Sequence, residues 1–200
     1  MIGIVDYGAG NPASVEFALD RLAAPHRRVG SPEQVVGLSG LIFPGVGRAR
    51  AAADRLRDAG LWPLLRSWSR PLLGVCLGLQ LLFEHSEEDD CPGLARLPGT
   101  VGRLRPAGLK VPHMGWNQVQ ALTPSFLGGP GDEPQWFYFV HSYAALESSA
   151  ACGRTDYGVS FVSAVQADAL WGVQFHPERS GPAGAKVFER FVALCNAQPQ

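Results

Sequence analysis

A cysteine stands between two glycines where the sequence pattern changes. In LLGVCLGLQLLFE, residues 72–84, an apolar run typical of a buried strand precedes Cys76 and a helix-like run follows it. A side chain at such a strand-to-helix corner is pushed into open space, and Gly74 and Gly78 remove the Cβ atoms that would clash across the turn. This is the thiol form of the G-x-S-x-G nucleophile elbow, although these five residues fit a structural cysteine equally well.

The corner would also activate the sulfur. A helix beginning at Leu77 is expected to aim its free N–H groups and the positive end of its dipole at Cys76, which favours the thiolate. The N–H of Leu77 could in addition donate to an oxyanion formed on a substrate carbonyl.

A thiol nucleophile needs a base, and the chain has five histidines. His26 lies in a basic loop and His85 adjoins the acidic run SEEDD, so both are expected to be solvated. His176 follows the buried-strand pattern LWGVQF. If that strand runs parallel to the strand before Cys76, both side chains emerge at the carboxyl edge of one sheet, where open α/β proteins place their sites.

An acidic partner for this base lies two residues further along. Pro177 should keep the chain from turning helical, so that His176 and Glu178 point the same way. The carboxylate can then hold the imidazole in the required tautomer and stabilise its charged form. Cys76, His176 and Glu178 together predict a nucleophile, a base and an orienting acid.

The elements that must position these residues alternate in type. Strand and helix patterns follow one another through the first half of the chain, and short strand patterns separated by Gly- and Pro-rich turns fill residues 99–174 before a final helix. Asn11 and Pro12 are typical of the start of the first helix. The fold class expected is α/β, an open and mostly parallel sheet with helices on both faces and some antiparallel strands in the second half, in a single domain over residues 1–200.

Composition narrows the function classes. The 17 basic and 18 acidic residues nearly balance, and no run of five like charges occurs, so neither a nucleic-acid groove nor a membrane patch is expected. The N-terminus reads as a first strand rather than a signal peptide, and a cytoplasmic protein is expected. The four cysteines match no paired zinc motif, and no metal site is expected. No cofactor is expected either. GAGNPA, residues 8–13, fits a dinucleotide-binding pattern only superficially, because the acidic residue expected after the next strand is missing.

The motifs G-x-C-x-G-x-Q and H-P-E resemble those of the class I (triad) glutamine amidotransferases. Further segments along the chain narrow the resemblance to the glutaminase subunits of imidazole glycerol phosphate synthase: DYGAGN, PGVG, GVCLGLQLLFEHSEE, KVPHMGWN, FYFVHSY and GVQFHPERS. KVPHMGWN and DYGAGN are specific to that subunit, whereas the cysteine and H-P-E motifs are shared by the whole class.

The resemblance implies roles for individual residues. Cys76 would attack the side-chain amide of glutamine to give a thioester and ammonia, with His176 moving protons and Glu178 orienting it. The oxyanion hole would be formed by Leu77 and by a peptide N–H near Val46 or Gly47. The residues implied in binding the amino-acid end of glutamine are Gln80, His141, Ser142 and Tyr143.

The resemblance also implies a partner. The docking face for a TIM-barrel cyclase subunit, with which the chain would form a heterodimer, would comprise Asn11, Pro112, Met114, Trp116 and Tyr138. Ammonia would pass through that barrel to make imidazole glycerol phosphate and AICAR in histidine biosynthesis, and His113 would support a docking loop. Since a glutaminase running alone would waste glutamine, the oxyanion hole is expected to be poorly formed until the cyclase binds its substrate.

Three alternatives stay open at this point. A glutaminase of pyridoxal phosphate synthase would share the triad but should lack VPHMGWN. A degenerate, non-catalytic docking subunit would have no need of a complete triad, and a stand-alone cysteine hydrolase would need no second protein. Three departures from the resembled family are also present. Pro12 replaces a bulky aliphatic residue, and residues 48–50 lack the aromatic side chain that commonly follows PGVG. In HPERSG, Arg179 and Gly181 stand for the usual lysine and glutamine.

Overall fold

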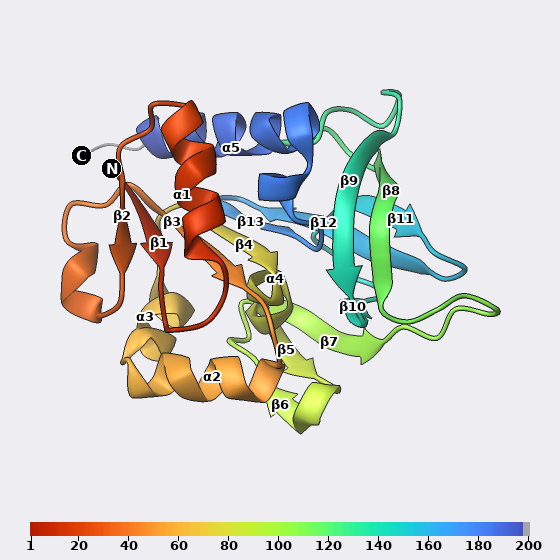
Figure 1. The fold of residues 1–200 in the computed structure, drawn as a ribbon, viewed down its shortest axis with the longest axis horizontal. Coiled ribbons are helices and arrows are strands. Elements are labelled where there is room, and N and C mark those ends of the chain that lie inside the picture. The colour runs from red at the N-terminus through yellow and green to blue at the C-terminus, as the bar shows by residue number, and fades with distance from the viewer. Residues whose placement is uncertain (198–200) are drawn as a thin grey trace.

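The computed structural model describes residues 1–197, which form a nine-stranded sheet with helices on both faces and a smaller four-stranded sheet beside it (Figure 1). The large sheet has the order β2-β1-β3-β4-β13-β12-β11-β8-β9, and the small sheet has the order β10-β7-β5-β6. Within this part of the chain, every helix is too short or too polar to cross a bilayer.

The strands of the large sheet are β1 (Ile2–Val5), β2 (His26–Val29), β3 (Gly40–Gly45), β4 (Leu72–Cys76), β8 (His113–Ala121), β9 (Gln135–His141), β11 (Ala151–Asp156), β12 (Ser160–Ala167) and β13 (Leu170–Val173). Those of the small sheet are β5 (Phe83–Ser86), β6 (Cys91–Pro92), β7 (Leu97–Arg103) and β10 (Tyr143–Ala145). The helices are α1 (Pro12–Arg21), α2 (Ala49–Asp58), α3 (Leu61–Ser67), α4 (Leu77–Leu82) and α5 (Gly181–Asn196), with the 3₁₀ turns η1 (Pro32–Val35), η2 (Glu88–Asp90) and η3 (Pro177–Arg179).

The type of strand pairing changes once across the large sheet, from parallel to antiparallel. β2, β1, β3, β4 and β13 run parallel to their neighbours, whereas β12, β11, β8 and β9 are joined by antiparallel pairing. β13 returns from the antiparallel half to lie beside β4, with Val173 opposite Val75. The predicted fold class is confirmed, and this return places two segments far apart in sequence at one carboxyl edge.

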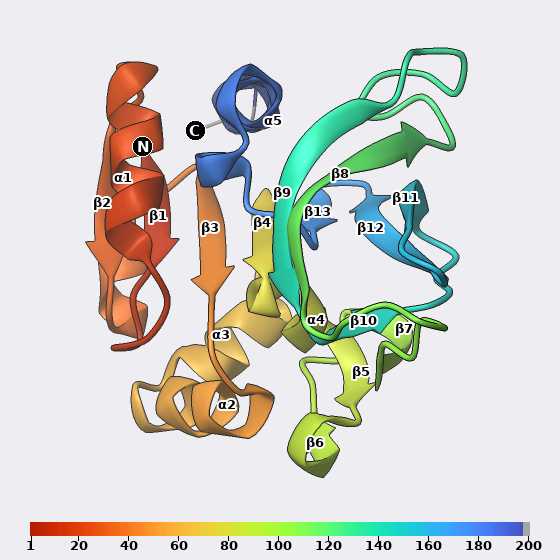
Figure 2. The same ribbon diagram turned by 45° about the vertical axis from the view of Figure 1, so that its right-hand side comes forward.

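The core lies on both faces of the parallel strands because successive side chains alternate sides. In β3, Ile42 packs with buried residues of α1 and α5, and Phe43 packs on the opposite side with residues of α2, α3 and α4. Figure 2 shows the same division, with α1 and α5 on one side of the strands and α2 and α3 on the other.

Two of the expected elements have different bounds. The helix expected to begin at Leu77 ends at Leu82, because Phe83 has an extended backbone and starts β5, whose residues pair with β7. The buried side chain of Phe83 belongs to the core, so tertiary packing overrides the helical pattern. The strand predicted over residues 170–175 ends at Val173. The sequence patterns did not predict β10, β11 and α3.

Candidate active site

Cys76 occupies a strained corner between β4 and α4, as predicted. Its backbone has φ +53° and ψ −107°, a positive-φ conformation that is costly for a residue with a side chain. A Cβ on Gly78 would lie 1.9 Å from the carbonyl oxygen of Phe43, and one on Gly74 would lie 2.9 Å from the Leu79 nitrogen. The flanking glycines are therefore needed because the turn passes directly against the backbone of β3 and α4.

His176 and Glu178 follow the end of β13, at the same sheet edge as Cys76. The Nδ1 atom of His176 is 2.8 Å from Oε1 of Glu178, and both side chains are only 5% exposed. This geometry lets the carboxylate accept a hydrogen bond from Nδ1–H, which leaves Nε2 to exchange protons with a neighbour.

The local route to this contact differs from the expectation. His176 itself is extended, as residues before proline usually are, but Pro177 does not prevent a helical turn: it begins η3. The fixed φ of proline suits the first position of a helix, so the chain closes a 3₁₀ turn in which the Arg179 N–H donates to the carbonyl of His176. The tight turn brings the Glu178 carboxylate back to the imidazole.

The sulfur and the imidazole share one pocket. Cys76 and His176 both line it, and Nε2 of His176 is buried and without a hydrogen-bond partner within the described residues. Burial by itself would lower the pKa of His176, but the neighbouring Cys76 and Glu178 outweigh burial and raise this pKa to about 10. The imidazole is therefore well suited to accept the thiol proton and remain charged.

The pocket has a volume of about 270 Å³ and brings together most of the predicted site residues. Its lining residues are Val46, Gly47, Cys76, Leu77, Gln80, Glu88, Pro112, Val140, His141, Ser142, Tyr143 and His176. The three predicted oxyanion-hole residues and the four predicted substrate-binding residues all lie in this set. Glu178 stands behind His176, which is the place of an orienting group.

The predicted substrate-binding residues are themselves tightly held. The Nε2 atom of Gln80 lies 2.7 Å from the carbonyl oxygen of Tyr143 and 3.1 Å from Oε1 of Gln174, so both of its N–H groups are engaged and only its oxygen remains for a ligand. His141 uses both ring nitrogens, Nδ1 toward the Tyr143 carbonyl and Nε2 toward Nδ1 of His113. His141 therefore shapes the pocket with its ring.

The paired histidines are buried and neutral. Burial lowers the pKa of His141 to about 3 and that of His113 to about 4. His113 stacks on Tyr157 and Phe139, and its Nε2 faces the Asn117 amide. His113 is therefore held as a buried, neutral residue of β8, and its support of a docking loop stays a prediction.

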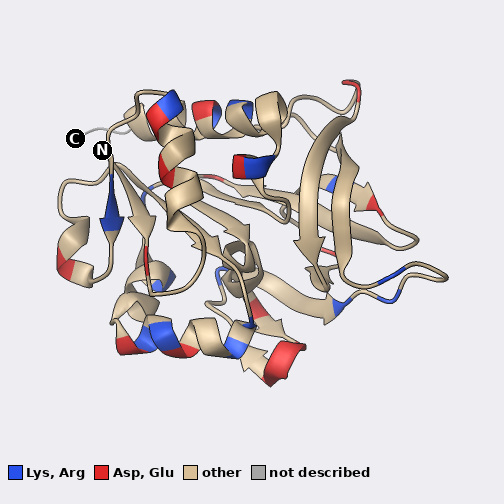
Figure 3. Cartoon of the chain, in the orientation of Figure 1, with Lys and Arg blue, Asp and Glu red and all other residues tan. Residues whose placement is uncertain are grey.

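The acidic run SEEDD contributes to the site, which sequence reasoning missed. Glu88 lines the pocket, and its Oε2 accepts a hydrogen bond from the N–H of Ala49 at 2.9 Å. Arg48 forms an ion pair with Asp89, and Arg50 donates to the carbonyls of Asp89 and Asp90. In Figure 3 the acidic η2 lies against the basic start of α2. The opposite charges of GRAR and SEEDD were the signal in the sequence that could have revealed these contacts.

Four of the predicted docking residues lie on or beside the β8–β9 edge. Met114 and Trp116 are 61% and 53% exposed, Trp116 stands edge-on to Tyr138, and Pro112 precedes β8. Trp136, opposite Gln118, extends the same strand pair with a further exposed aromatic that was not predicted.

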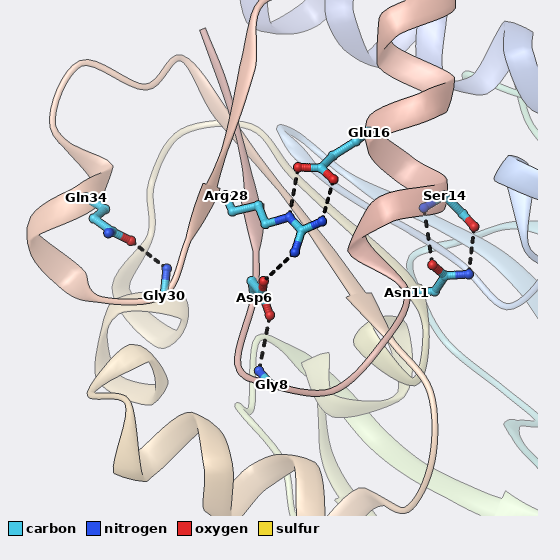
Figure 4. A network of polar contacts seen from close by, with 8 residues as sticks. All are labelled: Asp6, Gly8, Asn11, Ser14, Glu16, Arg28, Gly30 and Gln34. Carbon is cyan, nitrogen blue, oxygen red and sulfur yellow. Dashed lines mark hydrogen bonds and ion pairs between the residues drawn. The ribbon is translucent and has the colours of Figure 1, made fainter.

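Asn11 lies apart from these strands, in the loop between β1 and α1. Its side chain accepts from the Ser14 N–H and donates to the Ser14 hydroxyl, which caps α1 as predicted (Figure 4). Arg28 holds the start of the same loop by pairing with Asp6 and Glu16.

Comparisons with known proteins agree with this geometry. The profile of the family "Glutamine amidotransferase class-I" matches residues 25–195. The chain is 47% identical to an imidazole glycerol phosphate synthase subunit HisH of Desulfitobacterium hafniense, over 98% of this chain and 95% of that protein. It is 48% identical to the protein of the same name from Moorella thermoacetica, over 96% and 94% of the two chains.

Two solved structures share the fold. A crystal structure of a glutamine amidotransferase superposes with a TM-score of 0.76 at 20% identity, covering 98% of this chain and 99% of that one. A putative GMP synthase protein from Thermoplasma acidophilum superposes with a TM-score of 0.74 at 18% identity, covering 98% and 94%.

Proposed function

Because this chain belongs to the class I glutamine amidotransferases, and within them to the HisH subunits of imidazole glycerol phosphate synthase, we propose that its Cys76, His176 and Glu178 hydrolyse glutamine to glutamate and ammonia. The observation that carries this proposal is the meeting of all three residues at one sheet edge, with Cys76 and His176 open to the same pocket.

The reaction would begin with transfer of the Cys76 thiol proton to Nε2 of His176. The sulfur then attacks the side-chain carbonyl carbon of glutamine, and the N–H groups of Leu77 and of Val46 or Gly47 stabilise the oxyanion. When the C–N bond breaks, His176 returns its proton to the departing ammonia and a thioester remains on Cys76. Water, deprotonated by His176, cleaves the thioester to release glutamate and regenerate the thiol.

Glutamine would be held by its amino-acid end at the opposite side of the pocket. The Glu88 carboxylate can pair with the α-ammonium group, and the free oxygen of Gln80 can accept one of its protons. Ser142 and Tyr143 line the same end, while the ring of His141 sets its shape. Since Glu88 also accepts from Ala49, substrate binding is coupled to the segment that carries Val46 and Gly47.

The printed names of the relatives describe one subunit of a synthase, which supports a partner subunit for this chain. We propose a heterodimer with a TIM-barrel cyclase that docks on Pro112, Met114, Trp116 and Tyr138, with Asn11 at the rim. The exposed aromatic and methionine side chains suit such an interface, because these residue types are enriched where proteins associate. Ammonia would enter the cyclase for the formation of imidazole glycerol phosphate and AICAR in histidine biosynthesis.

The decisive experiment is co-purification with the cyclase followed by an ammonia assay, with and without the nucleotide substrate of the cyclase. We expect hydrolysis to rise by about 10²–10³ when the loaded cyclase is present, the factor typical of one oxyanion-hole donor. Equal rates for the isolated chain and for the loaded complex would contradict the gating. Cys76→Ala should abolish hydrolysis and leave cyclase binding intact, whereas a non-catalytic docking subunit would show no hydrolysis in the unaltered protein.

A further inference from the structure

A buried glutamine outside the triad touches the reacting sulfur. Gln174 lies just after β13, two residues before His176, and is 1% exposed. Its Nε2 atom lies 3.6 Å from Sγ of Cys76, within the range of a nitrogen–sulfur hydrogen bond. Its Oε1 atom lies 3.1 Å from Nε2 of Gln80.

The direction of this chain of hydrogen bonds is set by the main chain. The carbonyl oxygen of Tyr143, 2.7 Å from the Gln80 amide, can only accept, so the Gln80 atom facing it must be nitrogen. That nitrogen also faces Gln174, whose nearer atom must then be the oxygen. The remaining amide atom of Gln174 is therefore the nitrogen, and it must donate toward Cys76.

The sulfur needs such a donor once it has lost its proton. As a thiol, Cys76 can donate to the carbonyl oxygen of Val140, 3.9 Å away. As a thiolate, it can no longer donate, and this carbonyl repels it. An N–H donor in a buried site then has a large effect, because hydrogen bonds to charged groups are stronger than neutral ones and are little weakened by water there.

We propose that Gln174 is a further catalytic residue, whose side-chain amide donates a hydrogen bond to the Cys76 thiolate and holds Gln80 in register with it. This inference deepens the proposed function and depends on it for the identity of the reaction. The same amide links the nucleophile to Gln80 and so to the main chain of Tyr143 at the substrate end of the pocket.

The test measures the reactivity of the sulfur without using glutamine. The alkylation rate of Cys76 by iodoacetamide is followed across pH for the full chain, with Cys76→Ala giving the background. The other thiols should react slowly, since burial raises the pKa of Cys91 and raises the pKa of Cys152 and of Cys195 to about 12. All Gln174 variants keep the titratable groups near the sulfur. These groups are His176 with Glu178 after β13, His141 at the end of β9, Tyr7 after β1 and Glu88 in η2.

Gln174→Met keeps the size of the side chain and removes its donor and acceptor. We expect its alkylation profile to move toward alkaline pH by about one to two units, and kcat/KM for glutamine in the loaded complex to fall about 10- to 100-fold. Gln174→Glu keeps an oxygen for Gln80 but places an acceptor or a negative charge against the sulfur, so the profile should move at least as far. Thermal unfolding identifies any variant that fails to fold, and either variant alone tests the proposal.

Gln166→Met is the matched control. In the unaltered protein, the Oε1 atom of Gln166 accepts a hydrogen bond from the main-chain N–H of Phe126 at 3.0 Å, outside the pocket. The methionine variant therefore loses a comparable hydrogen bond. Its alkylation profile should equal that of the unaltered protein. An unchanged profile in folded Gln174→Met or Gln174→Glu would overturn the role of Gln174, even if hydrolysis were lost. Absence of hydrolysis in the unaltered complex would instead refute the proposed function, while the alkylation profiles would still decide on Gln174.

Discussion

Replacing Glu178 by glutamine tests the support that His176 receives from its acidic partner. The change keeps the size of the side chain and removes its negative charge. The contact that it alters is the 2.8 Å hydrogen bond between Oε1 and Nδ1, which is almost fully shielded from water. A hydrogen bond to a charged group contributes about 1.5–3 kcal/mol, so loss of the charge should lower kcat about 10- to 150-fold.

The same substitution should change the pH dependence of stability. His176 has its pKa raised from 6.5 to about 10 in the folded protein, so its stabilising contribution is complete below pH 6.5 and is lost as pH rises toward 10. Without the carboxylate, the pKa of His176 is raised less, and the decline in unfolding free energy across this range should be smaller. The second carboxylate oxygen of Glu178, Oε2, is buried without a hydrogen-bond partner within the described residues. In Glu178→Gln the amide N–H groups at this position would have no acceptor, so the unfolding free energy at pH 6 should fall.

The assays are glutamine hydrolysis in the presence of the loaded cyclase and urea unfolding at several pH values between 6 and 10. Glu189→Gln, an exposed change of the same chemistry on α5, is the control and should alter neither quantity. If Glu178→Gln kept full kcat and the pH dependence of the unaltered protein, Glu178 would have no part in supporting the imidazole.

The remaining predictions concern the elbow, the substrate pocket and the docking face. Gly78→Ala places a Cβ 1.9 Å from the Phe43 carbonyl, so it should displace the elbow, lower the unfolding midpoint and remove hydrolysis; a folded, fully active variant would contradict this. Glu88→Gln should raise KM for glutamine about 10-fold with little change in kcat, because it removes the charge that faces the α-ammonium group. Steady-state kinetics measures both constants, and an unchanged KM would show that Glu88 does not bind the α-ammonium group. Trp116→Ala should weaken cyclase binding about 30-fold, as expected for a central interface tryptophan, without altering the unfolding midpoint. Calorimetric titration checks this against Val36→Ala at the opposite edge of the sheet, and equal affinities for the two variants would exclude Trp116 from the interface.

Much of the site could be predicted because its key residues lie where local sequence dictates local geometry. The glycines around Cys76 require a sharp turn, and the apolar runs before Cys76 and His176 indicate buried strands. Because β4 and β13 pair in parallel, both runs end at one carboxyl edge, where open α/β sheets place their sites. These patterns also predict the nucleophile, the base and the orienting acid, whereas the glutamine substrate and the docking face were implied by the family resemblance.

The features that were missed depend on contacts between segments distant in sequence. Gln174 reads as one polar residue in an apolar strand, and only the packing of β4 and α4 beside it gives it Cys76 and Gln80 as partners. The acidic run reads as solvated, and only the fold places it beside Arg48. Phe83 fits a helical stripe as well as a strand, and pairing with β7 decides between the two.

Covalent labelling of the complex with an electrophilic analogue of glutamine, followed by mass spectrometry of the peptides, tests the proposed chemistry at its first step. One adduct is expected, on Cys76, which free glutamine suppresses and which is absent from Cys76→Ala. An adduct on a different residue, or undiminished glutamine hydrolysis by Cys76→Ala, would contradict a mechanism that begins at this sulfur.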